Sequence, residues 1–111
     1  MKSFNGRVAA ITGAASGMGR ALALALAREG CHLALADKNS QGLEQTSALI
    51  KTSTLAPVLI TTQVLDVSDR QAMVAWAARC VADHGQVNLV FNNAGVALSR
   101  TVEGVDYSDL E

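Results

Sequence analysis

The 111-residue chain is poor in several residue types, and each shortage excludes a class of protein. Its formal net charge is only −1, which gives no electrostatic footprint for nucleic acid or for an anionic membrane. Its two cysteines, Cys31 and Cys80, lie far apart in apolar segments, without the C-x-x-C spacing of a metal or redox site. We therefore expect no metal site and predict that both cysteines are buried thiols.

Long hydrophobic runs are also missing. Glycines and Arg20 interrupt the apolar segments near the N-terminus, so the sequence predicts neither a signal peptide nor a transmembrane span, and a cytoplasmic location is expected. Half of the residues are nevertheless hydrophobic, which is enough for a packed core. The length then indicates one small domain over residues 1–111.

Short apolar segments alternate with helical ones along the chain. Ser40 is predicted to cap the second helix, and Ser68 and Gln71 to form a capping box for the third. In the third helix, Met73, Trp76, Ala77 and Cys80 fall on one face, with Gly85 after the last turn. The predicted strands cover 7–12, 31–37, 58–66 and 86–95. The predicted helices cover 20–30, 40 to about 53, and the segment from Ser68 up to Gly85.

This βαβ spacing predicts the fold class. Alternating strands and helices indicate an α/β protein with a parallel sheet and helices on both faces. Right-handed crossovers favour a Rossmann-type, doubly wound sheet with strand order 3-2-1-4. A ligand cleft is then expected at the carboxyl ends of the strands, where the strand order reverses.

A glycine-rich stretch, "ITGAASGMGR" (11–20), joins the first strand to the first helix. Its spacing, Gly13-x-x-x-Gly17-x-Gly19, is neither G-x-G-x-x-G nor a P-loop, because the P-loop lysine is absent. The stretch would lie at the predicted cleft and open a helix, whose N–H groups and dipole favour an anion. The pyrophosphate of a dinucleotide is the natural occupant, and a tight turn without a ligand is the alternative.

An acidic residue, Asp37, ends the second predicted strand 18 residues after Gly19. In such a fold a carboxylate at this point accepts hydrogen bonds from the ribose hydroxyls of the cofactor. It would repel the 2′-phosphate of NADP, although Lys38 could offset part of that repulsion. NAD is therefore the expected cofactor and NADP a less favoured one; a surface aspartate in a turn is the alternative interpretation.

Together these residues resemble the short-chain dehydrogenase/reductase family. "TGAASGMG" (12–19) matches that family's T-G-x-x-x-G-x-G, and "LDV" (65–67) matches its aspartate after the third strand. "NNAG" (92–95) matches its N-N-A-G, and the resemblance implies that Asn92 ties neighbouring strands together. The matches are ordered and spaced as in the family across the whole chain.

The resemblance also implies a set of cofactor-binding residues. Backbone groups of Ser16, Gly17 and Met18 would face the pyrophosphate and ribose, while Gly13 and Gly19 would permit the turn and close helix packing.

Two further segments would complete that cofactor site. Asp66 would accept a hydrogen bond from the adenine amino group, and Val67 would contact the ring. Asn93, Ala94 and Gly95 would line the ribose on the nicotinamide side. The alternatives are an ordinary turn or cap aspartate at Asp66 and a simple turn at "NNAG".

The catalytic residues of the resembled family are not matched in this chain. The family's Ser and Tyr-x-x-x-Lys lie downstream, whereas Tyr107 is followed four residues later by Glu111. His32 and His84 are interpreted as structural. We expect the cofactor-binding part of an NAD-dependent oxidoreductase, incomplete at its C-terminus, that transfers hydride between nicotinamide and an alcohol or carbonyl substrate.

Two other functions and one partner remain to be weighed. The chain could be a dinucleotide-binding module without catalysis, or an S-adenosylmethionine-dependent methyltransferase, against which "NNAG" and the glycine spacing argue. The apolar strand 87–93 would form an edge of the predicted sheet and invites pairing with a second copy. A homo-oligomer is therefore expected.

Overall fold

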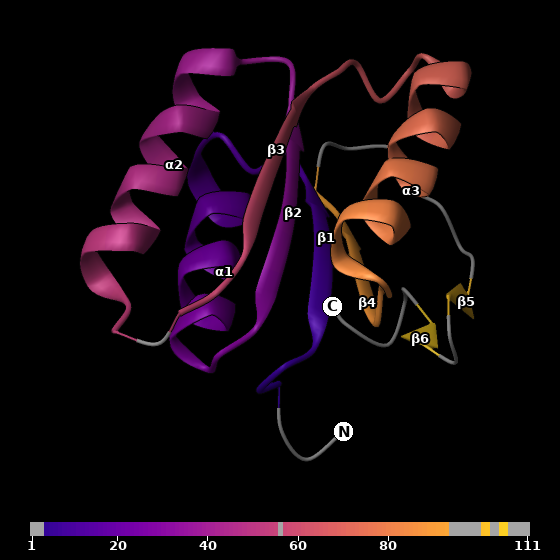
Figure 1. Cartoon of the computed structure of the whole chain (residues 1–111). Helices are drawn as coiled ribbons and strands as arrows, with labels where there is room; N and C mark the ends of the chain where they lie inside the picture. Colours follow the sequence, from indigo (N-terminus) through magenta and orange to yellow (C-terminus); the bar gives the residue numbers. More distant parts are fainter. Residues whose placement is uncertain (1–3, 56, 94–100, 103–104, 107–111) are drawn as a thin grey trace.

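The computed structural model describes residues 4–55, 57–93, 101–102 and 105–106 (Figure 1). Strands and helices alternate along most of this length, as the sequence predicts. The elements are β1 (Val8–Thr12), α1 (Gly17–Arg28), β2 (His32–Asp37), α2 (Ser40–Ser53), β3 (Ile60–Val64), α3 (Arg70–His84), β4 (Leu89–Asn92), β5 (Thr101–Val102) and β6 (Val105–Asp106).

Strands β1 to β4 form one parallel sheet in the order β3-β2-β1-β4. This confirms the predicted Rossmann-type order, in which the chain reverses direction across the sheet at β1. Thr12 pairs with Ala36 of β2 on one side and with Asn92 of β4 on the other, so the carboxyl ends of the three strands lie together. The described β5 and β6 pair with each other in a separate antiparallel sheet.

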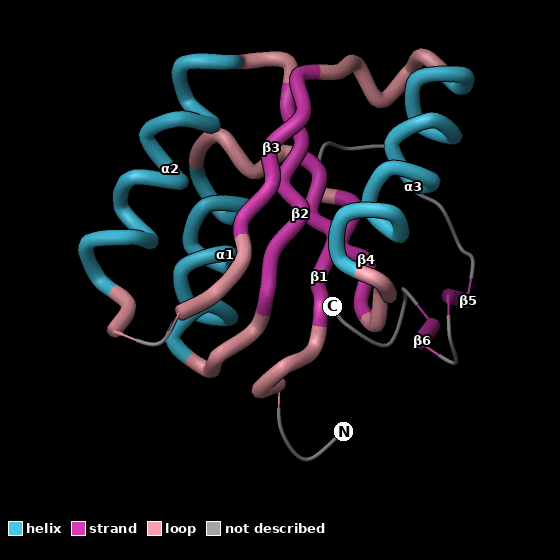
Figure 2. Tube along the Cα trace, in the orientation of Figure 1, coloured by secondary structure: helices cyan, strands magenta, loops and turns pink. Residues whose placement is uncertain are grey.

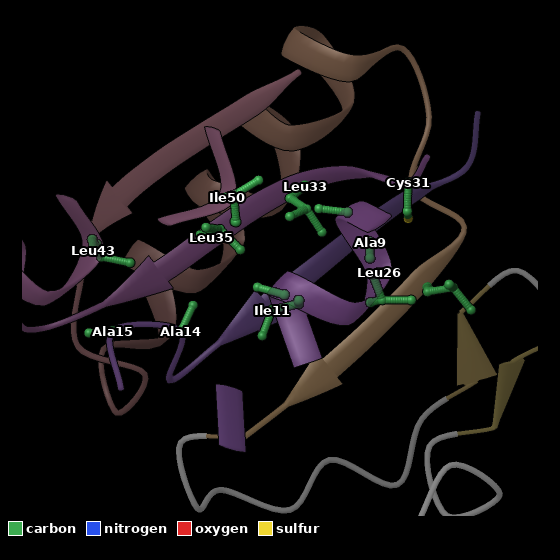
Figure 3. Close-up of a cluster of buried hydrophobic side chains, with 13 residues drawn as sticks. Ala9, Ile11, Ala14, Ala15, Leu26, Cys31, Leu33, Leu35, Leu43 and Ile50 are labelled. Atoms are coloured by element: carbon green, nitrogen blue, oxygen red, sulfur yellow. The ribbon is translucent and has the colours of Figure 1, made fainter. Parts of the chain in front are cut away.

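Side chains of alternate residues pack on opposite faces of the sheet, because successive residues of a strand point to opposite sides. One face carries Ile11 of β1 and Leu33 and Leu35 of β2, all fully buried. Helices α1 and α2 cover it with Leu26, Leu43 and other apolar side chains (Figure 3). This cluster also includes Ala14 and Ala15 of the glycine-rich loop, so the loop is anchored in the core.

The opposite face carries small side chains. Ala10, Ala34 and Ala36 lie under α3 and form one buried cluster with its Trp76. Cys80 is buried beside Trp76, and Cys31 is buried in the other cluster, which confirms the prediction of two buried thiols. The helices therefore cover both faces of the sheet, α1 and α2 on one and α3 on the other (Figure 2).

Both predicted N-caps are wrong by one position. The side chain of Asn39, not Ser40, accepts the backbone N–H of Gly42 at the start of α2. Asp69 caps α3 by accepting from Ala72 N, so Ser68 and Gln71 form no capping box. In each case a residue of similar N-cap preference, Asn39 or Asp69, directly adjoins the predicted one, and its side chain makes the capping bond.

The element bounds also differ from the predicted ones. Helix α1 begins at Gly17, inside the glycine-rich loop, and β3 and β4 are shorter than their apolar segments. Gly85 ends α3 with φ of 80°, as its C-cap position predicts. Of the described helices, none has the length and hydropathy to cross a membrane.

Candidate functional site

The loop between β1 and α1 lies at the carboxyl end of the central strand. Gly13 and Gly17 take positive φ angles of 67° and 56°, a region that favours glycine. Ser16 lies at the N-cap of α1, but its side chain makes no capping hydrogen bond. Ser16, Gly17 and Met18 are exposed, so the first N–H groups of α1 face solvent at the positive end of the helix dipole.

Two glycines of this loop have different structural roles. A Cβ on Gly19 would lie 2.0 Å from the carbonyl oxygen of Gly13 and 3.0 Å from Nδ2 of Asn93, so only glycine fits there. A Cβ on Gly17 would meet nothing within 4 Å. Gly19 therefore allows α1 to approach the loop, whereas Gly17 leaves open space above the helix end.

The carboxylate of Asp37 lies beside the loop, at the end of β2. Its Oδ2 accepts the backbone N–H of Ala15 at 3.0 Å, and its Oδ1 accepts the N–H of Asn39 at 3.0 Å. Each carboxylate oxygen can accept a second hydrogen bond. The side chain is half-buried, so it is held in place and still reachable from solvent.

Asp66 lies at the same edge of the sheet, because the N–H of Leu65 donates to the carbonyl of Asp37 at 3.0 Å. Its Oδ1 accepts both the N–H and the hydroxyl of Ser68, at 2.9 and 2.8 Å. These bonds, together with the charge of Lys38, hold the pKa of Asp66 below its usual value. Asp66 thus stabilises the turn ahead of α3, which is the alternative interpretation of this aspartate given above. Its carboxylate is also exposed and can accept further hydrogen bonds. Val67 beside it is half-buried.

The end of β4 lies on the other side of the loop. The hydroxyl of Thr12 donates to Oδ1 of Asn92 at 2.8 Å, which joins β1 to β4 as the family resemblance implies. Asn93 is exposed and close to Gly19. The other two predicted site residues of this segment, Ala94 and Gly95, and the single tyrosine, Tyr107, lie outside the described residues.

Three residues behind the loop were not identified from the sequence. Arg20 of α1 donates to the carbonyls of Ala15 and Gly42, and to the hydroxyl of Thr46 at 2.9 Å. Thr46 is buried and hydrogen-bonds the carbonyl of Ala14 at 2.8 Å. A Cβ on Gly42 would lie 2.7 Å from that of Ala15, so α2 packs directly against the loop. The one sequence signal for this contact between α2 and the loop was Gly42, a glycine inside a predicted helix.

Other polar groups lie away from the loop. His32 Nδ1 accepts the N–H of Leu59 at 2.9 Å, and His84 Nε2 lies 2.9 Å from the hydroxyl of Thr61, so both histidines join elements as structural residues. A cavity of about 220 Å³ opens between β3 and α3, lined by Thr61, Thr62, Gln63, Trp76, Arg79, Cys80 and Asp83. Within the described ranges, no three His, Cys, Asp or Glu side chains are arranged to hold a metal ion.

Comparison with known proteins agrees with this arrangement. A family model described as short chain dehydrogenase matches residues 7–111. A Mycobacterium tuberculosis protein named "Putative oxidoreductase SadH" is 41% identical over 111 residues, which are all of this chain and 39% of that protein. Levodione reductase of Leifsonia aquatica is 44% identical over 94 residues, or 84% of this chain and 34% of the enzyme.

Solved structures of similar proteins share this fold. A structure of NAD⁺-bound xylitol dehydrogenase superposes with a TM-score of 0.78 and 38% identity, over 86% of this chain and 35% of that one. Levodione reductase superposes with a TM-score of 0.79 and 40% identity, over 84% of this chain and 36% of that one. The chain thus spans only about a third to two fifths of the length of these named relatives. With its strand order, its glycine-rich loop and this match over nearly its whole length, the chain belongs to the short-chain dehydrogenase/reductase family.

Proposed function

We propose that this chain forms the cofactor-binding part of an NAD-dependent oxidoreductase. The reaction is hydride transfer between the nicotinamide ring and an alcohol or carbonyl substrate. One observation carries the proposal: the carboxylate of Asp37 is fixed by Ala15 N at the point where the strand order reverses, beside the exposed N-terminus of α1. This arrangement places a ribose acceptor next to an anion site, and a dinucleotide presents both groups.

The pyrophosphate is assigned to the N-terminus of α1. The N–H groups of Ser16, Gly17 and Met18 are its donors, and the helix dipole adds a favourable potential. The open space at Gly17 leaves room for the phosphate oxygens. Gly13 supports the turn at its positive φ, and Gly19 lets the helix lie against the loop.

The adenosine half is assigned to the ends of β2 and β3. Asp37 accepts the ribose hydroxyls with the lone pairs that Ala15 and Asn39 leave. Asp66 accepts the adenine amino group, since its carboxylate is exposed at this edge of the sheet, and Val67 contacts the ring. Asp66 and Val67 follow Leu65, whose N–H bonds the carbonyl of Asp37, so we place them within reach of the same nucleoside as Asp37.

The preference for NAD follows from charge. Two like charges about 4 Å apart at an effective dielectric constant near 20 repel by up to ~4 kcal/mol, which is the cost of a 2′-phosphate beside Asp37. Lys38 offsets part of this cost. Some relatives support the same choice, because xylitol dehydrogenase and a short chain dehydrogenase from Mycobacterium paratuberculosis were solved with NAD bound.

The nicotinamide half is assigned to the segment after β4. Asn93, Ala94 and Gly95 line the ribose on that side, and bound nicotinamide supplies the hydride acceptor or donor. Asn92 holds this segment in register by its hydrogen bond to Thr12. No catalytic residue is assigned within these 111 residues, so a module that binds the dinucleotide without turnover is the competing function.

Self-association and a cytoplasmic location belong to the same proposal. Strand β4 pairs with β1, and no second partner for it occurs among the described strands, although its residues are mostly apolar. Such an edge favours pairing with a second copy. The two free, buried thiols suit a reducing compartment. Analytical ultracentrifugation of the chain tests the proposed self-association, and a concentration-independent monomer would contradict it.

Calorimetric titration with NADH, NADPH and S-adenosylmethionine tests the central proposal. We expect binding of NADH, weaker binding of NADPH and none of S-adenosylmethionine. Binding of S-adenosylmethionine alone, or of none of the three, would contradict it. A protein that continues past residue 111 is then assayed with alcohols and NAD; binding without any turnover would favour the non-catalytic module.

A further inference from the structure

Arg20 lies in the first turn of α1, yet its side chain runs behind the glycine-rich loop to α2. Its Nε donates to the Thr46 hydroxyl at 2.9 Å. Its Nη2 donates to the carbonyls of Ala15 and Gly42 and reaches Oε1 of Gln45 at 3.3 Å. The guanidinium therefore satisfies several acceptors of α2 and one carbonyl of the loop itself.

Thr46 holds the preceding loop carbonyl. Its side chain is fully buried, and its hydroxyl lies 2.8 Å from the carbonyl oxygen of Ala14 and 3.1 Å from that of Gly42. The hydroxyl has one proton to donate and accepts from Arg20, so the shorter contact, to Ala14, is the stronger bond. Two successive loop carbonyls are thus bound from the α2 side.

Because a peptide bond is planar, a contact that holds its C=O also fixes the direction of its N–H group. In a trans peptide the C=O and the following N–H point in opposite directions. Thr46 binds the C=O of the Ala14–Ala15 peptide, and its N–H, on Ala15, donates to Oδ2 of Asp37. Arg20 binds the C=O of the Ala15–Ser16 peptide, so the N–H of Ser16 is directed away from α2, at the exposed start of α1.

We infer that Arg20 and Thr46 are positioning residues of the dinucleotide site, each acting on a different part of it. Thr46 holds the peptide that fixes Asp37 and therefore controls the choice between NAD and NADP. Arg20 holds the peptide that directs Ser16 N–H, a donor for the pyrophosphate that both cofactors share. This inference rests on the proposed function, in that the ligand is a dinucleotide.

The two assignments predict different binding patterns for two substitutions. Thr46→Val keeps the shape of the side chain and removes the hydroxyl, so we expect NADH affinity to fall several-fold and the ratio of NADH to NADPH affinity to narrow. Arg20→Met removes all the donors, so we expect both affinities to fall about tenfold with an unchanged ratio. A tenfold loss of affinity is the size of effect expected when a hydrogen bond to a charged ligand group is lost.

Matched controls come from the same two helices. Thr52→Val changes an exposed threonine of α2, which donates only to the nearby Leu49 carbonyl at 3.0 Å, and Arg28→Met changes the exposed arginine in the last turn of α1. Both should leave the two affinities within twofold of those of the unsubstituted chain. A purely structural role for Thr46 predicts that Thr46→Val lowers NADH and NADPH affinity in the same proportion, which would overturn its assignment. For Arg20, affinities that Arg20→Met leaves within twofold of the unsubstituted chain, or a changed ratio between the two cofactors, would overturn its assignment.

Amide hydrogen exchange of the ligand-free chain separates this inference from the proposed function. Thr46→Val should speed exchange at Ala15 N–H by more than the loss of global stability, measured at core amides of β1 and β2, accounts for. Unchanged exchange at Ala15 would show that Thr46 does not hold this peptide. If neither cofactor binds the unsubstituted chain, the proposed function and the cofactor roles fail together, whereas the exchange result still decides whether Thr46 fixes the contact to Asp37.

Discussion

The backbone N–H of Ala15 donates to Oδ2 of Asp37 over 3.0 Å, and this hydrogen bond joins the glycine-rich loop to the end of β2. The two residues are 22 positions apart in the sequence. Their contact joins the two features on which the proposed cofactor site depends, the exposed N-terminus of α1 and the carboxylate of Asp37.

Replacing Asp37 tests the cofactor preference. Asp37→Ala removes the ribose acceptor and the charge that repels a 2′-phosphate, so NADH should bind less tightly and the gap between NADH and NADPH should narrow. Both dissociation constants are measured by calorimetry. Asp83→Ala is the matched control, because Asp83 pairs with Arg79 on α3 at 3.3 Å and is remote from the loop. Equal affinity for the two cofactors in the unsubstituted chain would refute the charge argument.

Replacing Gly17 tests the anion site. Gly17→Val places a branched side chain in the open space at the start of α1 and strains a φ of 56°, at a cost of about 1–2 kcal/mol. NADH affinity should fall at least tenfold while the fold persists. Gly6→Val is a closely matched control, since Gly6 has φ of 76° with equally open surroundings but lies before β1. Equal NADH affinity in both variants would mean that the loop is only a turn.

Gly42 tests the packing of α2 on the loop. In an exposed helix, Gly→Ala stabilises by about 1 kcal/mol. Here the new methyl group would lie 2.7 Å from the Ala15 Cβ and 2.8 Å from its carbonyl oxygen, neither of which can rotate away. Overpacking of this kind costs about 1–3 kcal/mol, so Gly42→Ala should lower the urea midpoint. Gln41→Ala, at the exposed neighbouring position, should not; a raised midpoint for Gly42→Ala would show that α2 can shift.

The buried thiols predict a loss of stability in alkali. Burial raises the pKa of Cys31 and of Cys80 to about 11, from an ordinary value of 9.0. The unfolded chain therefore ionises first, and the free energy of unfolding should fall as the pH rises from about 9 to 11. Urea titrations at several pH values measure this slope. A Cys31→Ala and Cys80→Ala double variant should show a shallower slope, and an identical slope would contradict the assignment.

His84 predicts the opposite dependence in acid. Burial lowers the pKa of His84 below 6.5, with a further lowering by His32 and an opposing effect of Asp83. The neutral ring is favoured in the folded chain, so stability should fall as the pH drops through and below 6.5. In the His84→Gln variant, the part of the stability loss that comes from protonating His84 should disappear. Urea midpoints between pH 7.5 and 5 give the comparison, and unchanged pH dependence would count against a half-buried, neutral His84.

Much of the fold follows from local sequence signals. The apolar β-forming segments, the helix formers between them and the right-handed crossover predict the order β3-β2-β1-β4, which the structure confirms. Cys31 and Cys80 were predicted to be buried from their apolar surroundings, and they are. The cofactor roles of the glycine-rich loop, Asp37 and Asp66 stay predictions, although the structure places these segments at one edge of the sheet.

Cap positions were decided by local competition that the sequence pattern did not resolve. Asn39 adjoins Ser40 and Asp69 adjoins Ser68, so each helix start offered two acceptors within two residues. The structure selects the amide and the carboxylate. Because Asp69 caps α3, the hydroxyl of Ser68 donates instead to Oδ1 of Asp66.

The sequence by itself determined the strand order and the place of the glycine-rich loop at the end of the first strand, because hydrophobic periodicity, glycine positions and chain connectivity act over short distances. Only the tertiary structure decided how the loop is held. Thr46 of α2 binds the carbonyl of Ala14 and accepts from Arg20 of α1, and these contacts depend on the close packing of α2 against the loop at Gly42. Contacts between residues some 30 positions apart depend on the packing of whole elements, and packing leaves no periodic signal in a single sequence.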